Sequence, residues 1–225
     1  DKILKTIKDA RIAVAFIALH GRLGEDGTIQ SILEKAGIPY TGSGIAASKL
    51  AINKVSTQSA LKQKNIPVAD YQVFRNNGQE KSGHALEDVR HFPVVVKPAC
   101  EGSSIGIALV EKKDDLEVAL ANAFRYGKEV LVERFIKGRE LTVGILAEEP
   151  LPVVEVRSKN AFFDFTAKYG TGLSEYVVPA VLDPAEAQKV QQVALSAHRA
   201  LGCRDVSRVD IILDEAGNPY VLEIN

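Results

Sequence analysis

The stretch Ser207–Asn225, SRVDIILDEAGNPYVLEIN, decides the fold of this chain. Residues 208–213 and 220–225 carry the Val, Ile and Leu side chains that are typical of short strands. The six residues between them, DEAGNP, include the Gly, Asn and Pro that favour a turn. The pattern therefore predicts an antiparallel hairpin.

Four polar side chains interrupt this apolar hairpin. Alternation puts Arg208 and Asp210 on one face of the first strand, and it puts the second pair, Glu223 and Asn225, on one face of the second strand. An even-length loop sets Asp210 opposite Glu223, and it likewise sets Arg208 opposite Asn225. Facing carboxylates beside apolar side chains repel each other and lose hydration, which a divalent cation compensates. Carboxylate and amide oxygens suit Mg²⁺ or Mn²⁺, so a metal site open to phosphate is predicted; a solvated outer face is the alternative.

A second charged segment follows the apolar strand Val130–Glu133, upstream of the hairpin. The chain turns after this strand, and Glu133 and Glu140 flank the turn. Such a turn exposes backbone groups near Ile136 that can hydrogen-bond to the edge of an adenine base. An ordinary charged surface turn is the alternative.

A glycine-rich loop follows the β-branched strand that ends at Lys97. In CEGSSIGI (100–107), glycines let backbone N–H groups approach an anion, and serines add hydroxyl donors. Lys97 supplies a point charge suited to phosphate. The loop residues of interest are Gly102, Ser103, Ser104 and Gly106. A plain hairpin with a flexible tip is the alternative.

The rest of the chain alternates strands and helices, which argues for α/β architecture. Residues 11–19, RIAVAFIAL, form a near-continuous apolar run and predict a buried strand. A turn at GEDG (24–27) precedes a helix that closes at Gly37, and a second helical stretch runs to about Lys64.

After Ile66 short strands dominate the pattern. Helices are expected over 114–126 and from Asp183 to Gly202, each closed by a glycine. The other strands are expected at 71–74, 93–97, 105–110, 141–147 and 152–157.

Residues 42–47, GSGIAA, fit the dinucleotide-binding pattern G-x-G-x-x-A. No convincing strand precedes them, and no acidic residue lies about 20 residues on, where a ribose would need one. A nicotinamide-dependent dehydrogenase is therefore a weak hypothesis.

Composition excludes several classes of function. The 225 residues are 46% hydrophobic and 25% charged, with 28 basic and 29 acidic residues and a net charge of −1. This balance gives no electrostatic case for nucleic acid or an anionic membrane, and the longest apolar run, 12–19, is far below the roughly 20 residues of a membrane span. Only Cys100 and Cys203 occur, so no disulfide framework is expected and a cytoplasmic setting is the default.

Taken in order, these segments resemble the ATP-grasp superfamily and, within it, the D-alanine–D-alanine ligase family. The resemblance runs nearly end to end and rests on a specific combination of motifs. The matching segments are LHGRLGEDGTIQ (19–30), GIPYTGSG (37–44), ASK (47–49), VKPACEGSSIG (96–106), LVERFIKGRELTVGIL (131–146), FFDFTAKY (162–169) and the hairpin at 207–225.

The resemblance implies three groups of site residues. ATP would be bound by Lys54, Lys97, Lys168, Ser104, Gly106, Glu133, Ile136 and Glu140. Two Mg²⁺ or Mn²⁺ ions would be bound by Asp210, Glu223 and Asn225. In the catalytic group, Arg208 would stabilise the transferred phosphate, His20 would lie near the reacting carboxylate, and Ser103 and Tyr169 would belong to a hydrogen-bond triad.

The resemblance also implies an α+β ATP-grasp fold preceded by part of a Rossmann-like domain. Residues 1–46 would end that domain, 47–133 would form the central subdomain, and 134–225 would form the C-terminal one. The implied reaction joins two D-alanines through a D-alanyl phosphate for peptidoglycan synthesis. The implied partners are D-alanine, ATP and a second copy of the chain in a homodimer, with neither nucleic acid nor membrane.

Departures from the family pattern lie at both ends. The family's first glycine-rich loop would precede Asp1, and its proline-glycine loop would follow Asn225. Two alternatives remain open: another ATP-grasp carboxylate–amine ligase, such as a D-alanine–D-lactate ligase, and a non-catalytic ATP-binding module. A tyrosine at position 169 resembles the pattern of the D-alanine-specific branch of the family. Arg208 is unnecessary for simple nucleotide binding, which argues against the non-catalytic module.

Overall fold

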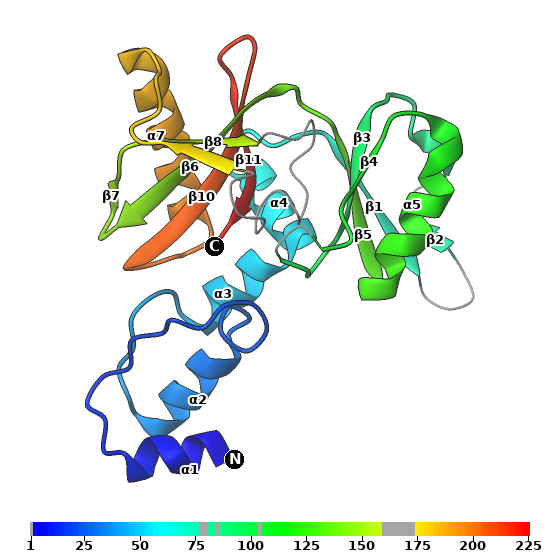
Figure 1. Ribbon diagram of the computed structural model, residues 1–225. Helices are drawn as coiled ribbons and strands as arrows, with labels where there is room; N and C mark the ends of the chain where they lie inside the picture. Colours follow the sequence, from blue (N-terminus) through cyan, green and yellow to red (C-terminus); the bar gives the residue numbers. More distant parts are fainter. Residues whose placement is uncertain (1, 77–80, 84–85, 103–104, 159–173) are drawn as a thin grey trace.

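The computed structural model describes residues 2–76, 81–83, 86–102, 105–158 and 174–225. Figure 1 shows a narrow helical limb at the N-terminal end and two lobes that are each built on a β-sheet. We call residues 2–52 the limb, 71–134 the first lobe and 138–225 the second lobe. Helix α4 (Lys54–Gln63) lies between the two lobes (Figure 1).

The limb contains no buried strand within its described residues, so the strand predicted over 11–19 is wrong. Only Ala15 pairs there, in an isolated parallel bridge to Tyr40. A strand needs neighbours that satisfy its backbone groups, and the described chain brings to this segment only residues 39–41, which bond to Ala15 and Ile17. Its apolar side chains are consequently exposed, with Phe16 81% accessible. The limb helices are α1 (Lys2–Asp9), α2 (Thr28–Ala36) and α3 (Ile45–Ile52).

The predicted single helical stretch up to Lys64 is broken at Asn53. The backbone of Asn53 is extended, with φ −95° and ψ 104°, and its side chain accepts a hydrogen bond from the N–H of Ser56 at 3.0 Å. Asn53 therefore ends α3 and caps α4. The break makes Lys54 the first residue of α4, and the backbone N–H of Lys54 donates to the carbonyl of Ala99 at 2.8 Å.

The first lobe is a five-stranded sheet in the order β2-β1-β5-β3-β4. Helix α5 covers one face of it, where Leu116 and Leu120 pack in a cluster with Val96 and Val132 (Figure 1). The strands are β1 (Tyr71–Asn76), β2 (Lys81–Gly83), β3 (Val94–Pro98), β4 (Ala108–Val110) and β5 (Glu129–Arg134). The helices are η1 (Leu86–Asp88), η2 (Lys113–Asp115), α5 (Leu116–Ala123) and η3 (Phe124–Tyr126).

The second lobe is a six-stranded sheet in the order β11-β10-β6-β8-β9, with β7 paired to β6. The apolar face of α7 (Pro184–Ala200) packs on this sheet through Val190, Ala194 and Ala197. The strands are β6 (Gly138–Leu146), β7 (Glu149–Pro150), β8 (Val154–Ser158), β9 (Ser174–Val177), β10 (Val206–Asp214) and β11 (Pro219–Ile224).

The predicted C-terminal hairpin is confirmed by the pairing of β10 with β11. Asp210 stands opposite Glu223, and Arg208 and Asn225 exchange backbone hydrogen bonds of 2.7 and 2.8 Å. The register shifts between Asp210 and Ile211, which leaves Leu222 as the extra residue of a β-bulge. The sequence therefore predicts which side chains face each other, whereas the bulge appears only in the structure.

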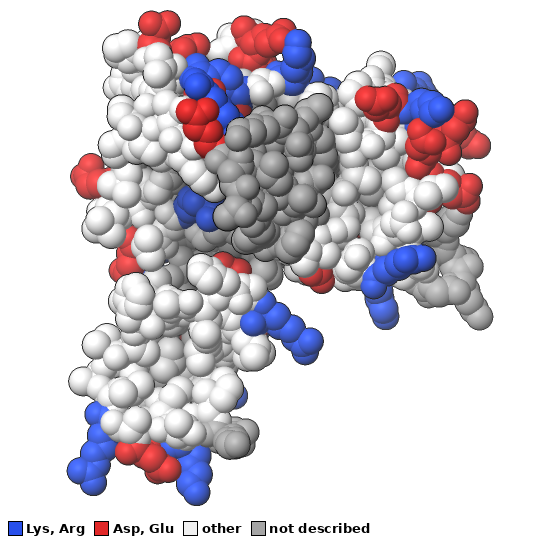
Figure 2. Space-filling model, viewed as in Figure 1, with Lys and Arg blue, Asp and Glu red and all other residues white. Residues whose placement is uncertain are grey.

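Sheet pairing within the described residues is antiparallel throughout both lobes, so the α+β expectation is confirmed. The division into 1–46, 47–133 and 134–225 stays a prediction. Figure 2 shows acidic and basic side chains interspersed on the visible face. No helix in the described part of the chain is long and apolar enough to cross a membrane.

Candidate active site

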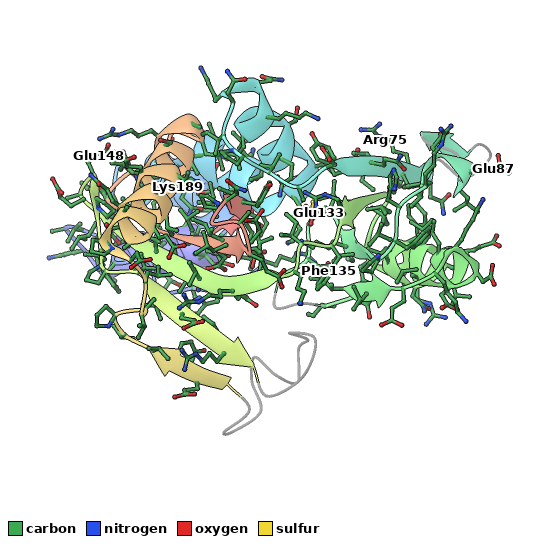
Figure 3. The ribbon with its side chains drawn as sticks, turned by 90° about the horizontal axis from the view of Figure 1, so that it is seen from above. Arg75, Glu87, Glu133, Phe135, Glu148 and Lys189 are labelled. Atoms are coloured by element: carbon green, nitrogen blue, oxygen red, sulfur yellow. The ribbon has the colours of Figure 1, made fainter. Side chains whose placement is uncertain are left out.

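The candidate site lies where α4 meets the two sheets. Two carboxylates, Asp210 and Glu223, face each other across β10 and β11. A buried ion pair, Lys97–Glu133, lies on the neighbouring strands β3 and β5 of the first lobe. Figure 3 shows Glu133 between the two lobes.

Asp210 is buried and receives hydrogen bonds on both carboxylate oxygens. Arg208 donates from Nε to Oδ1 and from Nη2 to Oδ2, each at 2.9 Å. Thr142 donates to Oδ1 at 2.7 Å, and the Asn225 amide donates to Oδ2 at 3.3 Å. The charge of Asp210 is therefore compensated by one cation and two neutral donors.

Arg208 keeps its charge in this surrounding. Burial opposes the charge, but the hydrogen bonds from Arg208 to Asp210 and the nearby carboxylates Glu223 and Glu25 outweigh it and raise the pKa of Arg208. The guanidinium is half exposed, so it can also reach a ligand outside the hairpin.

Lys54 joins the hairpin to the loop after β3. Its buried ammonium lies 3.3 Å from Oε2 of Glu223 and donates to the backbone carbonyl of Glu101 at 2.7 Å. The break at Asn53 makes this possible, because it starts α4 at Lys54 and points the N-terminus of the helix toward the site. The predicted phosphate lysine and the predicted metal ligand are thus in contact.

Glu133 is only 2% exposed and has partners on both oxygens. Lys97 forms an ion pair with Oε2, and the side-chain amide of Gln58 donates to Oε1 at 3.2 Å. Two residues predicted to bind ATP therefore contact each other, and Gln58 joins them from α4.

The glycine-rich loop is described on either side of Ser103 and Ser104, which lie outside the described residues. Gly106 has φ +71°, and a side chain there would meet Tyr126 at 2.7 Å and Pro98 at 2.8 Å. Glycine is therefore required at this position for both conformation and space. Lys168 and Tyr169 also lie outside the described residues.

The remaining predicted nucleotide residues are at the junction of β5 and β6. Ile136 is buried in the connection between these strands. Glu140 is half-buried on β6, where it pairs in register with Ile212 of β10. Both residues therefore lie on segments that run from Glu133 toward the β10–β11 hairpin.

His20 lies at the surface of the limb. Its side chain is 93% exposed, and its Nδ1 lies 3.8 Å from Oε1 of Glu25. Glu25 in turn accepts the N–H of Gly21 at 2.6 Å and contributes to the electrostatic field at Arg208. The GEDG turn thus faces the second lobe, with His20 at its edge.

Two contributing residues, Thr142 and Gln58, were not predicted from the sequence. Thr142 pairs in register with Asp210 on the neighbouring strand β6, which linear spacing cannot reveal. Gln58 follows Lys54 by four residues, so the helical stretch predicted up to Lys64 already placed both on one face, and this spacing was the available signal.

The donor set fits a hard divalent cation, because two carboxylates lie together with a side-chain amide that can supply an oxygen. Two side-chain cations lie beside the carboxylates and balance their charges. The candidate set has only two carboxylates and one amide, and among the described residues no three His, Cys, Asp or Glu side chains gather as a metal site. Such a sparse set leaves coordination positions for phosphate oxygens.

Comparison with known proteins gives two family matches. The family model described as D-ala D-ala ligase C-terminus matches residues 60–225, and the one described as D-ala D-ala ligase N-terminus matches residues 2–43. The D-alanine–D-alanine ligase of Geotalea uraniireducens is 48% identical over 215 residues, which cover 95% of this chain and 68% of the relative.

Solved structures agree with these matches. The chain is similar to the crystal structure of D-alanine–D-alanine ligase from Bacillus anthracis complexed with ATP, with a TM-score of 0.84, 31% identity, and coverage of 100% of this chain and 72% of that one. It is also similar to the VanG D-Ala:D-Ser ligase from Enterococcus faecalis, with a TM-score of 0.84, 34% identity, and coverage of 95% and 63%.

Proposed function

The chain belongs to the D-alanine–D-alanine ligase family, and we propose that it joins two D-alanines in an ATP-dependent reaction. The product is D-alanyl-D-alanine, a precursor of peptidoglycan, and the bond formed is a C–N peptide bond. The observation that carries this proposal is the facing pair Asp210 and Glu223, each beside a cation, Arg208 and Lys54.

ATP would bind between the two lobes. Lys54 and Lys97, with Lys168, would hold the phosphates, and Ser104 and Gly106 would supply the loop over them. The adenine would contact Glu133 and the backbone of Ile136, and the ribose hydroxyls would contact Glu140. The buried position of Lys97 and Glu133 supports this, because a desolvated pair binds a ligand more strongly than the same groups in water.

Asp210, Glu223 and Asn225 would hold two Mg²⁺ or Mn²⁺ ions. Bound ions of this kind neutralise the charge that develops on phosphate oxygens. Thr142 would keep the Asp210 carboxylate oriented, because its hydroxyl hydrogen bond to Oδ1 does not depend on Arg208.

The chemistry needs positioning and charge stabilisation rather than a nucleophilic side chain. One oxygen of the first D-alanine carboxylate takes the γ-phosphoryl group, and ADP leaves. The amine of the second D-alanine then attacks the acyl carbon, loses a proton, and inorganic phosphate leaves. Arg208 would stabilise the transferred phosphate, His20 would lie near the reacting carboxylate, and Ser103 and Tyr169 would close the site against water.

The test measures phosphate release from ATP and Mg²⁺ with and without D-alanine, together with formation of the dipeptide. We expect both to require D-alanine, and Asp210→Asn, which keeps the side-chain shape, to lower turnover at least about 100-fold. ATP hydrolysis that ignores D-alanine, or an Asp210→Asn variant with unchanged turnover, would contradict the proposal.

The second substrate separates the proposal from its neighbours in the family. D-Lactate and D-serine in the second position test a D-alanine–D-lactate ligase and the D-Ala:D-Ser specificity named for the Enterococcus faecalis relative. We expect D-alanine to be preferred over both. Formation of D-alanyl-D-serine, or of the ester D-alanyl-D-lactate, at the same rate as the D-alanine dipeptide would show a specificity broader than D-alanine.

The setting of the reaction completes the proposal. Use of ATP and two unpaired thiols, Cys100 and Cys203, support a cytoplasmic location. The partners are the small molecules D-alanine and ATP, and a second copy of the chain in a homodimer. The near-balanced charge supports the absence of a nucleic-acid partner.

A further inference from the structure

Gln58 is a buried polar residue to which the reaction assigns no role. It lies on α4, one helical turn after Lys54, and is only 1% exposed. Residues four apart in a helix share a face, so Lys54 and Gln58 both point toward the junction of the two sheets. Lys54 reaches Glu223 on that face, and Gln58 reaches a different set of acceptors.

The amide nitrogen of Gln58 contacts both lobes. It donates to Oε1 of Glu133 at 3.2 Å and to the backbone carbonyl of Leu222 at 3.1 Å, with the carbonyl of Val221 at 3.4 Å. All three partners are acceptors, which fixes the orientation of the amide with nitrogen toward them. Within the described chain the Gln58 oxygen has no hydrogen-bond partner, so the residue acts as a donor.

The carbonyl that Gln58 binds belongs to the β-bulge of β11. Leu222 is the extra residue between the Asp210–Glu223 and Ile211–Val221 pairs, and Glu223 follows it directly. A bulge re-aims the side chains beside it, and its carbonyl needs a partner when buried. Gln58 therefore ties the strand that aims Glu223 to the carboxylate of Glu133.

We propose that Gln58 is a positioning residue that orients Glu133 against the adenine and so determines the preference of the site for a 6-amino purine. This inference rests on the proposed function. Lys97 and Gln58 each occupy one oxygen of Glu133, and an ionised carboxylate has lone pairs left for a third donor. The adenine 6-amino group is a donor of that kind, and its bond depends on the angle at which the carboxylate is held.

The test compares binding of ATP and of purine riboside triphosphate, which lacks the 6-amino group, by titration calorimetry with Mg²⁺. In the unchanged protein we expect ATP to bind at least about tenfold more tightly than purine riboside triphosphate, because one well-placed hydrogen bond contributes about this factor. Gln58→Met keeps the length of the side chain and removes the donor. We expect it to reduce this ratio at least about fivefold.

Thr57→Val is the matched control. Thr57 is also on α4 and 1% exposed, and its hydroxyl donates to the carbonyls of Leu50 and Ala51 at 2.9 and 3.2 Å, away from Glu133. Both variants lose a buried hydrogen bond of the same helix. We expect Thr57→Val to weaken the binding of both nucleotides equally, so that the ratio of their affinities stays the same.

The outcomes distinguish failure of the proposed function from failure of the role assigned to Gln58. If the unchanged protein binds neither nucleotide, the proposed function fails and this inference fails with it. If the unchanged protein prefers ATP over purine riboside triphosphate and Gln58→Met keeps the same preference, this inference alone is wrong. It is also wrong on its own if Thr57→Val reduces the preference as much as Gln58→Met does. Should Gln58→Met fail to fold, Gln58→Asn, which withdraws the amide from Glu133 while staying polar, is measured against the same expected loss of preference.

Discussion

Individual charged residues in this protein are compensated by partners on the same strand and on neighbouring elements. Asp210 has Arg208, Thr142 and Asn225 around it, and Glu133 has Lys97 and Gln58. A buried carboxylate without such partners would cost several kcal/mol. The groups proposed to bind ligands are therefore also stabilising groups, and we expect removal of one to affect both properties.

Lys97→Ala tests this coupling. The change leaves Glu133 buried without its cation, and breaking such a pair from one side costs about 3–5 kcal/mol. We expect a lower free energy of unfolding in urea and loss of ATP binding in calorimetry. The control is Lys137→Ala, which removes an ion pair to Glu215 whose lysine side chain is 82% exposed. Equal stability of the Lys97→Ala and Lys137→Ala proteins would contradict the expected coupling.

Within the second lobe, strands β6 and β8 are joined by side chains as well as by backbone. Arg139 of β6 binds Glu155 of β8 through two hydrogen bonds of 2.8 and 2.9 Å, and Arg157, on β8 itself, adds two more of 3.1 and 2.9 Å. The hydrogen bonds from Arg139 are the main reason that the pKa of the buried Glu155 carboxyl lies below its usual value of 4.5; burial opposes them, and Arg157 adds to the lowering. The pair links the two strands at their shared end.

Glu155→Gln is expected to change how stability depends on pH. A lowered folded-state pKa adds stability above pH 4.5, and this stability is lost as the pH falls through the folded-state value. We expect the variant to be about 1.5–3 kcal/mol less stable at pH 7, and the difference to shrink below pH 4.5. Urea unfolding at several pH values measures it. A difference that stays constant down to pH 3 would rule out this linkage.

At the scale of the whole molecule, a clasp holds the limb against the second lobe. The clasp consists of residues 40–44 of the limb and residues 204–205 before β10. The carboxylate of Asp205 accepts the N–H of Gly42 at 3.0 Å, and Arg204 donates to the Gly42 carbonyl at 2.8 Å. The Arg204 guanidinium also lies 5.1 Å from the centre of the Tyr40 ring. Because Glu25 acts on Arg208 from the same limb, the clasp keeps the GEDG turn near the hairpin.

Arg204→Ala should loosen the limb without unfolding either lobe. The residue is exposed, so we expect a loss of about 1 kcal/mol, which is roughly fivefold faster amide exchange across residues 37–50. Exchange in α7 should stay as it was. The matched control is Lys189→Ala, which removes hydrogen bonds to Gly217 and Asn218 in the hairpin turn of the same lobe. Faster exchange over 37–50 in both variants would show that the clasp has no special role.

The sequence by itself determined the local parts of this protein. The hairpin at 207–225, the facing pair Asp210–Glu223, and the strands around Lys97 and Glu133 follow from two-residue alternation and turn residues, which act over neighbouring positions. The motif order was enough to identify the family.

Only the tertiary structure decided how these parts meet. Residues 11–19 carry a strand pattern but pair in the described chain only with the short segment 39–41, and a single helical pattern breaks at Asn53, which starts α4 at Lys54 and lets Lys54 bond to Ala99 and Glu223. Gln58 binds Glu133 and Leu222, residues 75 and 164 positions away. Such contacts depend on how elements pack in space, and spacing along the chain carries no signal for them.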